Sequence, residues 1–423
     1  MYDKKIILPL LFIFNGLLTF SQENAVKTDT LRKDALNVYM NASDYIKREI
    51  PYINYVRDIK VADVYIISTY QRTGSGGTEY TYFITGQNRF YGMADTVSFT
   101  SSPDDTQDII RMKEANTLKM GLMRYVLKTP LSQHIKISFS EPMSETVSTD
   151  KWNNWVFRVS VNGYLTGEKS YQSQYIRGNL SASRITSDWK ITFNSSYYYS
   201  VSTYDISGLK YTSKNNSKNL NAMVVKSLSD HWSAGGFLNV GSSSYSNEKF
   251  NAGIMPAIEY DIFPYSQSTR KQLRLLYRIG FNPVIYTDTT IYNQIKENLW
   301  SHSFSAAYEV VQKWGSVDMN LSYSNYLHDW SKNNLSFFSY LNLRITKGLS
   351  LNIGGGASLI HDQLGLVKGG ATTEEILLRR RELETQYEFY TSFGLTYTFG
   401  SIYNNVVNPR FGSSSGGGYY IFY

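Results

Sequence analysis

The sequence predicts an all-β transmembrane barrel of about twelve antiparallel strands, preceded by a small α+β domain. Three observations lead to this fold class. From residue 152 onward, apolar residues recur at every second position, which is the period of a strand with two different faces. The 36 Tyr residues and a charged fraction of only 18% are typical of a barrel with aromatic girdles. Beyond residue 20, no apolar run is long enough for a membrane-spanning helix.

The composition argues against several kinds of functional site. The chain has 423 residues and no Cys, so we expect no disulfide, thiolate metal ligand, thiol nucleophile or lipid anchor on an N-terminal Cys. The net charge of +7 comes from basic residues that are scattered along the chain, and we expect no nucleic-acid partner. No motif predicts a cofactor or a metal ion.

The N-terminus has the pattern of a secretory signal peptide. Lys4 and Lys5 precede an apolar run at 6–20, and Thr19 and Ser21 place small residues at its end. The alternative, a membrane-spanning anchor, needs about 20 apolar residues, and this run is shorter. We therefore expect residues 1–21 to be removed after export.

Residues 22–130 predict a compact α+β domain with two helices against a small antiparallel sheet. The expected helices lie within 31–48 and over 106–128, and the expected strands lie within 63–71, 78–87 and 96–100. A glycine-rich run at 73–77 suits a hairpin between the first two strands. Asp104 and Asp105 suit the cap of the second helix. Residues 131–151 then form a linker.

Residues 152–411 predict the barrel itself. In the segment 155–162, bulky apolar side chains fall on one face, and Arg158, Ser160 and Asn162 fall on the other. This alternation places apolar side chains toward lipid and polar ones toward the lumen. It recurs in about twelve segments, an even number, as in single-chain bacterial barrels. Residues 412–423 form either a tail or an extra strand.

The predicted connections support a barrel rather than a soluble β-sandwich. Connections from even-numbered to odd-numbered barrel strands are tight, whereas those at 200–218, 286–298 and 361–385 are long. Short turns are typical of the periplasmic side, so both ends of the barrel chain are expected there. Four Trp residues fall where odd-numbered strands enter the membrane and predict an interfacial aromatic belt: Trp155, Trp189, Trp232 and Trp314. A sandwich explains the alternation but neither of these features.

Charged residues of both signs fall on the predicted lumen face. They are Arg158, Lys190, Glu259, Arg274, Arg278, Glu309, Asp318, Arg344 and Glu388. Such charges either pair and plug a narrow interior, or line a pathway for small solutes. Twelve strands fall between the small barrels that side chains fill and the large ones that hold a channel. Both alternatives therefore stay open.

Several segments together resemble one family. They are YIKREIPYINYVRDIKVA at 45–62, WNNWVF at 152–157, FPYSQSTR at 263–270, GGATTEEILL at 369–378 and FGSIYNNVVNPRF at 399–411. In these segments the chain resembles a Bacteroidota family of Gram-negative outer-membrane β-barrel proteins with an N-terminal periplasmic domain, similar to barrels grouped as domains of unknown function. The resemblance implies an outer-membrane location and this architecture, and it implies no activity.

The octet SFGLTYTF at 392–399 also resembles the signal that barrel-assembly machinery reads on a last strand. Gly394, Leu395, Tyr397 and Phe399 carry the resemblance. Such a signal usually lies near the end of a chain, whereas this chain continues to Tyr423.

Candidate catalytic residues are few. Outer-membrane phospholipases pair a His with a Ser two residues along, on the lipid-facing side of a strand. Only His231 has such a partner, Ser233, and this pair adjoins a predicted periplasmic turn rather than the outer rim. His302 faces outward but is followed by Phe304 at that spacing. A lipid hydrolase is therefore the least favoured function, and we expect no enzyme.

Two functional hypotheses follow from the sequence. In the first, the barrel is an anchor that fixes residues 22–130 at the inner leaflet, where this domain docks a periplasmic protein. In the second, the barrel is a narrow, porin-like channel for small solutes. Either protein contacts outer-membrane lipid and the barrel-assembly machinery. The length of the segment 22–130 favours the anchor, because barrel insertion does not require such a domain.

Overall fold

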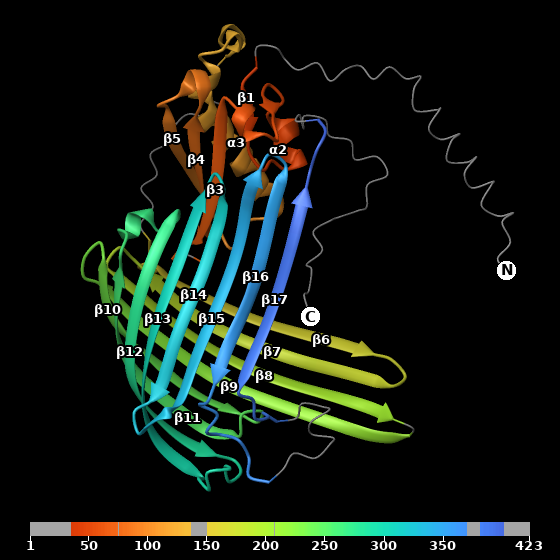
Figure 1. Cartoon of the computed structure of the whole chain (residues 1–423), viewed down its shortest axis with the longest axis vertical. Helices are drawn as coiled ribbons and strands as arrows, with labels where there is room; N and C mark the ends of the chain where they lie inside the picture. The colour runs from red at the N-terminus through yellow and green to blue at the C-terminus, as the bar shows by residue number, and fades with distance from the viewer. Residues whose placement is uncertain (1–34, 75, 137–149, 207, 370–380, 402–423) are drawn as a thin grey trace, which may run out of the picture.

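The computed structural model describes residues 35–74, 76–136, 150–206, 208–369 and 381–401, which form a small N-terminal domain and a large curled sheet (Figure 1). The predicted fold class is confirmed, since a twelve-stranded antiparallel sheet follows a small α+β domain. The predicted signal peptide, most of the linker, the segment 370–380 and the predicted tail at 412–423 lie outside the described residues.

The N-terminal domain is built on a five-stranded sheet with the strand order β2-β1-β3-β4-β5. β1 runs parallel to β2 and β3, whereas β3, β4 and β5 are antiparallel. With η for 3-10 helices, the elements are β1 Asn37–Tyr39, α2 Asp44–Glu49, β2 Asn54–Tyr55, η1 Ile59–Val61, β3 Val64–Arg72, β4 Thr78–Gly86, η2 Asn88–Phe90, β5 Ala94–Ser101, α3 Gln107–Val126 and η3 Pro130–His134. The last three strands and the second helix lie where the sequence predicted them.

The first helix differs from the prediction. A helix was expected within 31–48, but Asn37–Tyr39 forms strand β1 and only Asp44–Glu49 is helical. The Ser43 hydroxyl begins α2 by accepting a hydrogen bond from the N–H of Ile46, whose side chain is buried. The residues before Ser43 pair with β2 and β3 instead, because their pairing is decided by partners elsewhere in the chain.

Helix α3 packs on β4 and β5 and completes the core of the domain. The Thr106 hydroxyl caps the helix by accepting a hydrogen bond from the N–H of Ile109, so the predicted capping by Asp104 and Asp105 is wrong. Asp105 instead pairs with the ammonium of Lys113 at 2.7 Å. Neither α3 nor any other helix in the described ranges is long and apolar enough to cross a membrane.

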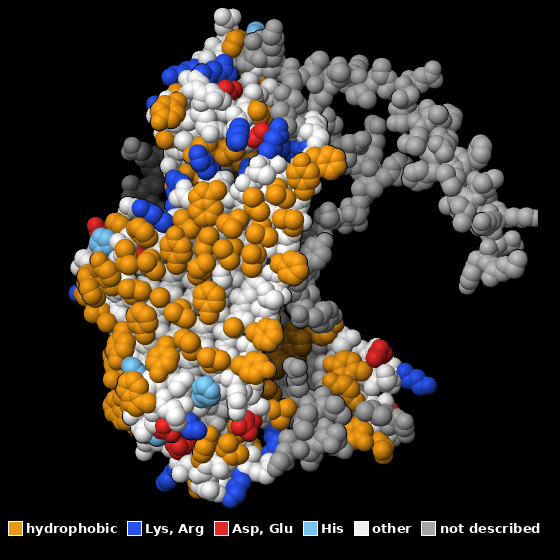
Figure 2. Space-filling model, in the orientation of Figure 1, with side chains coloured by type: hydrophobic (Ala, Val, Ile, Leu, Met, Phe, Trp, Pro, Cys, Tyr) orange, Lys and Arg blue, Asp and Glu red, His pale blue; other side chains and the backbone are white. Residues whose placement is uncertain are grey.

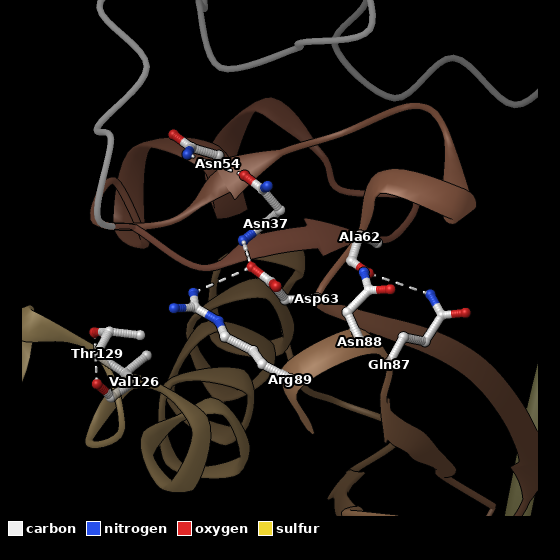
Figure 3. A network of polar contacts seen from close by, with 9 residues as sticks. All are labelled: Asn37, Asn54, Ala62, Asp63, Gln87, Asn88, Arg89, Val126 and Thr129. Carbon is white, nitrogen blue, oxygen red and sulfur yellow. Dashed lines mark hydrogen bonds and ion pairs between the residues drawn. The ribbon is translucent and has the colours of Figure 1, made fainter. Parts of the chain in front are cut away.

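A polar network ties the short parallel strands to the rest of the domain (Figure 3). The Asp63 carboxylate accepts a hydrogen bond from the N–H of Asn37 at 3.1 Å and forms an ion pair with Arg89 at 3.3 Å. The side-chain amide of Asn54 donates to the side-chain oxygen of Asn37 at 3.1 Å. These bonds supplement β1 and β2, which are too short for long ladders of their own.

The large sheet contains twelve antiparallel strands, each paired with its neighbours in sequence. The number and order of strands are therefore as predicted. The strands are β6 Trp155–Gly167, β7 Tyr171–Ile185, β8 Trp189–Ile206, β9 Leu209–Ser227, β10 Trp232–Ser243, β11 Glu248–Asp261, β12 Lys271–Tyr286, β13 Lys296–Gln312, β14 Gly315–Tyr326, β15 Asp329–Thr346, β16 Leu349–Ile360 and β17 Tyr387–Tyr397, with η4 Tyr265–Gln267 between β11 and β12.

The register gives this sheet one apolar and one polar face. Across β6 to β10, one row of directly paired residues consists of Phe157, Ala182, Phe193, Ala222 and Leu238. The row beside it, on the opposite face, consists of Arg158, Ser181, Asn194, Asn221 and Asn239. Figure 2 shows apolar side chains covering the outside of the curled sheet as a broad belt. The polar face is thus the inner one.

The strands β6 and β17 are the two edges of the sheet, and no pairing joins them among the described residues. An edge strand leaves a row of backbone N–H and C=O groups without partners, and lipid cannot supply them. Closure of the barrel by pairing of β6 with β17 therefore stays a prediction.

One connection differs clearly from the prediction. A long loop was expected at 200–218, but β8 extends to Ile206 and β9 begins at Leu209, and these two residues pair with each other. Thr203 pairs with Thr212, and Tyr204 with Tyr211, and such cross-strand pairs stabilise a hairpin despite the polar composition around them. The long connection 287–295 lies at this same end, as do the described residues 361–369 and 381–386 between β16 and β17, whereas the opposite end has one longer connection, 262–270.

Candidate functional site at the junction and in the lumen

The N-terminal domain packs against one end of the large sheet, and its contacts there define the candidate site. This end carries the connections β7–β8, β9–β10, β11–β12, β13–β14 and β15–β16. Figure 1 shows the domain at this end, with β3 reaching toward the sheet. The contacts come from β6 and β7, from the residue before β12, and from β15 and its turn. The domain therefore spans the end of the sheet.

The tip of the β3–β4 hairpin contacts the first strands of the sheet. The guanidinium of Arg158 donates a hydrogen bond to the carbonyl of Gly76 at 3.0 Å. A Cβ added to Gly74 would lie 2.8 Å from the Cβ of Ile185, so this close approach requires glycine. The glycine-rich run that the sequence assigned to a hairpin thus also forms one of the contacts by which the domain docks.

A second contact joins the segment around β1 to the β15–β16 turn. The Arg344 guanidinium lies 4.5 Å from the centroid of the Tyr39 ring and donates a hydrogen bond to the Tyr39 hydroxyl. The Lys347 ammonium lies 3.3 Å from the carboxylate of Asp58, which is nearly buried. Burial alone would raise the pKa of Asp58, but the Lys60 N–H and the Lys347 ammonium outweigh it, so the pKa lies below its ordinary value. The carboxylate is therefore charged at neutral pH.

A third contact lies between these two. The Arg270 guanidinium lies 4.8 Å from the centroid of the Phe83 ring on β4 and also donates to the side chain of Gln312 at 3.3 Å. Its Nε atom is buried and has no hydrogen-bond partner among the described residues. A cation over an aromatic face contributes about 0.5–1 kcal/mol at exposed sites and more when it is desolvated.

The predicted lumen charges share the inner face of the sheet, because the paired rows keep one phase from β6 to β17. The structure brings three of them together. The Nε of Arg274 lies 3.6 Å from a carboxylate oxygen of Glu259, and Lys190 lines the same cavity of about 230 Å³.

The other predicted charges lie apart from this cavity or meet different partners. Glu309 is paired in register with Asp318 on the neighbouring strand. Arg278 donates to the hydroxyl of Ser303 at 3.1 Å. Glu388 lies on the edge strand β17, opposite Ser358. Because Arg158 and Arg344 bind the N-terminal domain, the nine charges do not form one continuous network.

The four Trp residues lie at the end of the sheet that carries the domain. Trp155, Trp189 and Trp232 are the first residues of β6, β8 and β10, and Trp314 immediately precedes β14. The residues of the predicted assembly signal, Gly394, Leu395, Tyr397 and Phe399, lie in or just after β17. Their positions agree with an interfacial belt and a last-strand signal, and both roles stay predictions.

The His residues considered for catalysis have other partners. The Nδ1 of His231 lies 2.7 Å from the carbonyl oxygen of Asp261, while the Ser233 hydroxyl lies 2.9 Å from the hydroxyl of Tyr265. Their hydrogen bonds therefore run to different groups rather than to each other. His302 contacts the Tyr277 hydroxyl on the outer face.

Sequence reasoning missed most of the docking residues. Tyr39, Asp58, Phe83, Arg270 and Lys347 had no assigned role, because nothing in their local pattern distinguishes them from other surface residues. Lys347 lies in a tight turn whose next residue, Gly348, has a φ of 71°. That turn was predicted, but its partner in the domain was not.

Comparisons with known proteins give only distant likenesses. No family model matches the chain, and no curated protein sequence matches it. Among solved structures, the chain is similar to the NanC porin, with a TM-score of 0.28 and 12% identity over 57% of this chain and 98% of that one. It is also similar to the translocator domain of the autotransporter NalP from Neisseria meningitidis, with a TM-score of 0.23 and 10% identity over 58% of this chain and 87% of that one. Likenesses this distant indicate no function for this chain.

Proposed function

We propose that this protein is an outer-membrane β-barrel that anchors its N-terminal domain against the periplasmic end of the barrel. One observation carries the proposal: three separate sets of contacts fasten the domain across one end of the sheet, at Arg158, at Arg270 and at Arg344 with Lys347. A domain that is merely tethered would need none of them. The apolar belt on the outer face supports a membrane location, because so broad an apolar surface is unfavourable in water.

The membrane topology can be tested with single Cys residues, because the chain has none of its own. We choose Ser187→Cys in the β7–β8 turn and Lys210→Cys near the β8–β9 turn, each labelled on intact cells with a membrane-impermeant maleimide. Ser213, in the same strand as Lys210, is only 4% exposed and therefore unsuitable. We expect Lys210→Cys to react on intact cells and Ser187→Cys to react only after permeabilisation. The reverse pattern would overturn the proposed topology.

The anchored domain would present its remaining surface to a periplasmic protein. Tyr91 and Met120 are 89% and 69% exposed, and neither forms part of the three docking contacts. A photo-crosslinking residue in place of Tyr91, in the full chain in living cells, tests this role. A discrete crosslinked product supports docking of a partner. The absence of such a product with the crosslinking residue at Tyr91, and with it at Met120 in a second variant, would count against a docking role for this surface.

A narrow channel is the second candidate function. The cavity beside Lys190, Glu259 and Arg274 supports it, because charges of both signs line the inner face there. Planar-bilayer recordings separate the two candidates. A channel predicts an ohmic current whose ion preference changes in Arg274→Glu but not in Lys169→Glu, which changes the same charge in the β6–β7 turn. The absence of current through the wild-type protein, both with the N-terminal domain docked and with the domain removed, favours the anchor.

A further inference from the structure

A cleft of about 870 Å³ lies between the N-terminal domain and the end of the large sheet, beside the β15–β16 turn. The domain contributes Lys47 and Arg57 to its lining, and the sheet contributes Arg344 and Lys347. Among the described residues that line it, the single acidic side chain is Asp58. We call this space the basic cleft. Its excess of positive charge attracts an anion.

Lys47 indicates most directly that the basic cleft holds a ligand. Its side chain is only 8% exposed, and the carboxylate with which it pairs, that of Asp44, is 67% exposed and lies 3.7 Å from the ammonium. This distance is too long for a hydrogen bond. A largely buried lysine side chain whose ammonium has no close acceptor among the described residues is unfavourable. An anion bound in the cleft would supply the missing acceptor.

Arg57 adds a second donor with spare capacity. Its side chain is exposed on the cleft wall, and no ion pair or side-chain hydrogen bond joins it to another residue in the described part of the chain. The guanidinium presents paired N–H groups that match two oxygens of a phosphate, whereas the lysine ammonium acts as a point charge. Thr346 and Ser350 also line the cleft, and a hydroxyl is a hydrogen-bond donor.

The position of the cleft identifies the source of the anion. Tyr397 and Phe399, at the end of β17, line the cleft and are 63% and 79% exposed. Tyr397 pairs with Leu349, and both lie in the phase of the outer face of the sheet. The cleft therefore opens where the apolar belt ends. If the sheet spans the membrane as proposed above, that level is the interface at which phospholipid headgroups lie.

We propose that the basic cleft binds the phosphate group of an anionic phospholipid, with Lys47 and Arg57 as its main contacts. Basic pockets beside membrane-spanning segments bind anionic headgroups in this way. A bound headgroup would contact both the domain and the sheet, and would therefore stabilise the docking together with the contacts of Arg344 and Lys347. The inference that the anion is a lipid headgroup rests on the proposed function, because it needs the sheet to span a membrane. The inference that the ligand is an anion rests on the residues of the cleft alone.

Calorimetric titration of the full chain in a maltoside detergent tests the proposal. The probes are dihexanoyl phosphatidylglycerol, dihexanoyl phosphatidylcholine and inorganic phosphate. Lys47→Gln with Arg57→Gln removes two cleft charges, and Arg48→Gln with Lys60→Gln is the matched control, because these residues are exposed on the same segments outside the cleft. We expect phosphatidylglycerol to bind in preference to phosphatidylcholine. The cleft variant should bind it about 25-fold more weakly, at about fivefold for each charge, and the control should not change.

Three outcomes would overturn the proposal. They are unchanged affinity in the cleft variant, an equal loss in the control, and cleft-dependent binding of inorganic phosphate without any preference between the two lipids. Circular dichroism checks that each variant folds, and the exposed Arg57→Gln alone keeps the test valid if the change at Lys47 unfolds the domain. A failure of the proposed function would be detected by a different experiment, because labelling at Ser187 and Lys210 reports the membrane topology in cells, whereas the titration measures binding to purified protein.

Discussion

The docking of the N-terminal domain on the sheet can be weakened at two separate contacts. Arg158→Met with Arg344→Met removes two guanidinium groups while keeping side chains of similar length. One of these groups donates to the Gly76 carbonyl, and the other lies on the Tyr39 ring and donates to its hydroxyl. We expect this double variant to fold normally but to release the domain from the sheet.

The magnitude follows from the geometry of the two contacts. The exposed hydrogen bond from Arg158 contributes about 1 kcal/mol net. The contact of Arg344 with Tyr39 contributes about 0.5–1 kcal/mol from the ring and about 1 kcal/mol from the hydrogen bond. The two sites lie on different strands, β6 and β15, so their losses add. A total of about 2.5–3 kcal/mol raises the ratio of undocked to docked molecules about 60- to 140-fold.

Spin labels provide the assay, because the chain has no Cys of its own. Labels at Tyr91→Cys on the domain and Lys313→Cys in the β13–β14 turn report the distance between domain and sheet by pulsed electron paramagnetic resonance. The unmodified contacts should give one narrow distance distribution, and the double variant should add a broad, longer one. Lys169→Met with Lys210→Met, at the opposite end of the sheet, is the control. A narrow distribution in the double variant, or equal broadening in the control, would refute the assigned docking contacts.

Acid should weaken the docking of the N-terminal domain on the sheet. Burial alone would raise the pKa of Asp58, but a backbone hydrogen bond and the Lys347 ammonium hold this pKa below its unfolded value of about 3.9. The contribution of Asp58 to docking is therefore present above about pH 4 and is lost as pH falls through the folded pKa. The same spin labels should report release of the domain from the sheet in acid, and Asp58→Asn should remove this dependence on pH. Burial raises the pKa of Glu114, which accepts a hydrogen bond from the Tyr82 hydroxyl, so its contribution is present below the unfolded pKa and is lost as pH rises. Glu114→Gln should thus raise the thermal unfolding midpoint of the domain more at pH 8 than at pH 4 in calorimetry, and equal shifts at both would contradict this. Leu122→Ala, at a fully buried position of the domain core, should lower the free energy of unfolding of the domain by about 2–5 kcal/mol in urea, while the resistance of the sheet to detergent stays unchanged.

The sequence by itself determined the class of fold, the number and order of the strands, and the face on which most side chains lie. These features are local: the side chains of a strand alternate with a period of two, and antiparallel neighbours follow one another through short turns. The alternation around Arg158, and the apolar and polar positions of Gln107–Val126, were therefore enough to predict strand β6 and helix α3. The inner-face position of Glu259 and Arg274 followed from the same alternation.

Only the tertiary structure decided which residues meet across the molecule. Asn37–Tyr39 is a strand because β2 and β3 lie on either side of it, and β9 extends through 209–218 because β8 pairs with it there. Arg344 has the pattern of a lumen charge, yet it binds Tyr39 of the domain, and Asp58 pairs with Lys347 from the far end of the chain. The physical reason is that a local pattern fixes the direction of a side chain, whereas its partner depends on how distant segments pack. The docking contacts and the basic cleft join such distant segments, and no period along the chain records them.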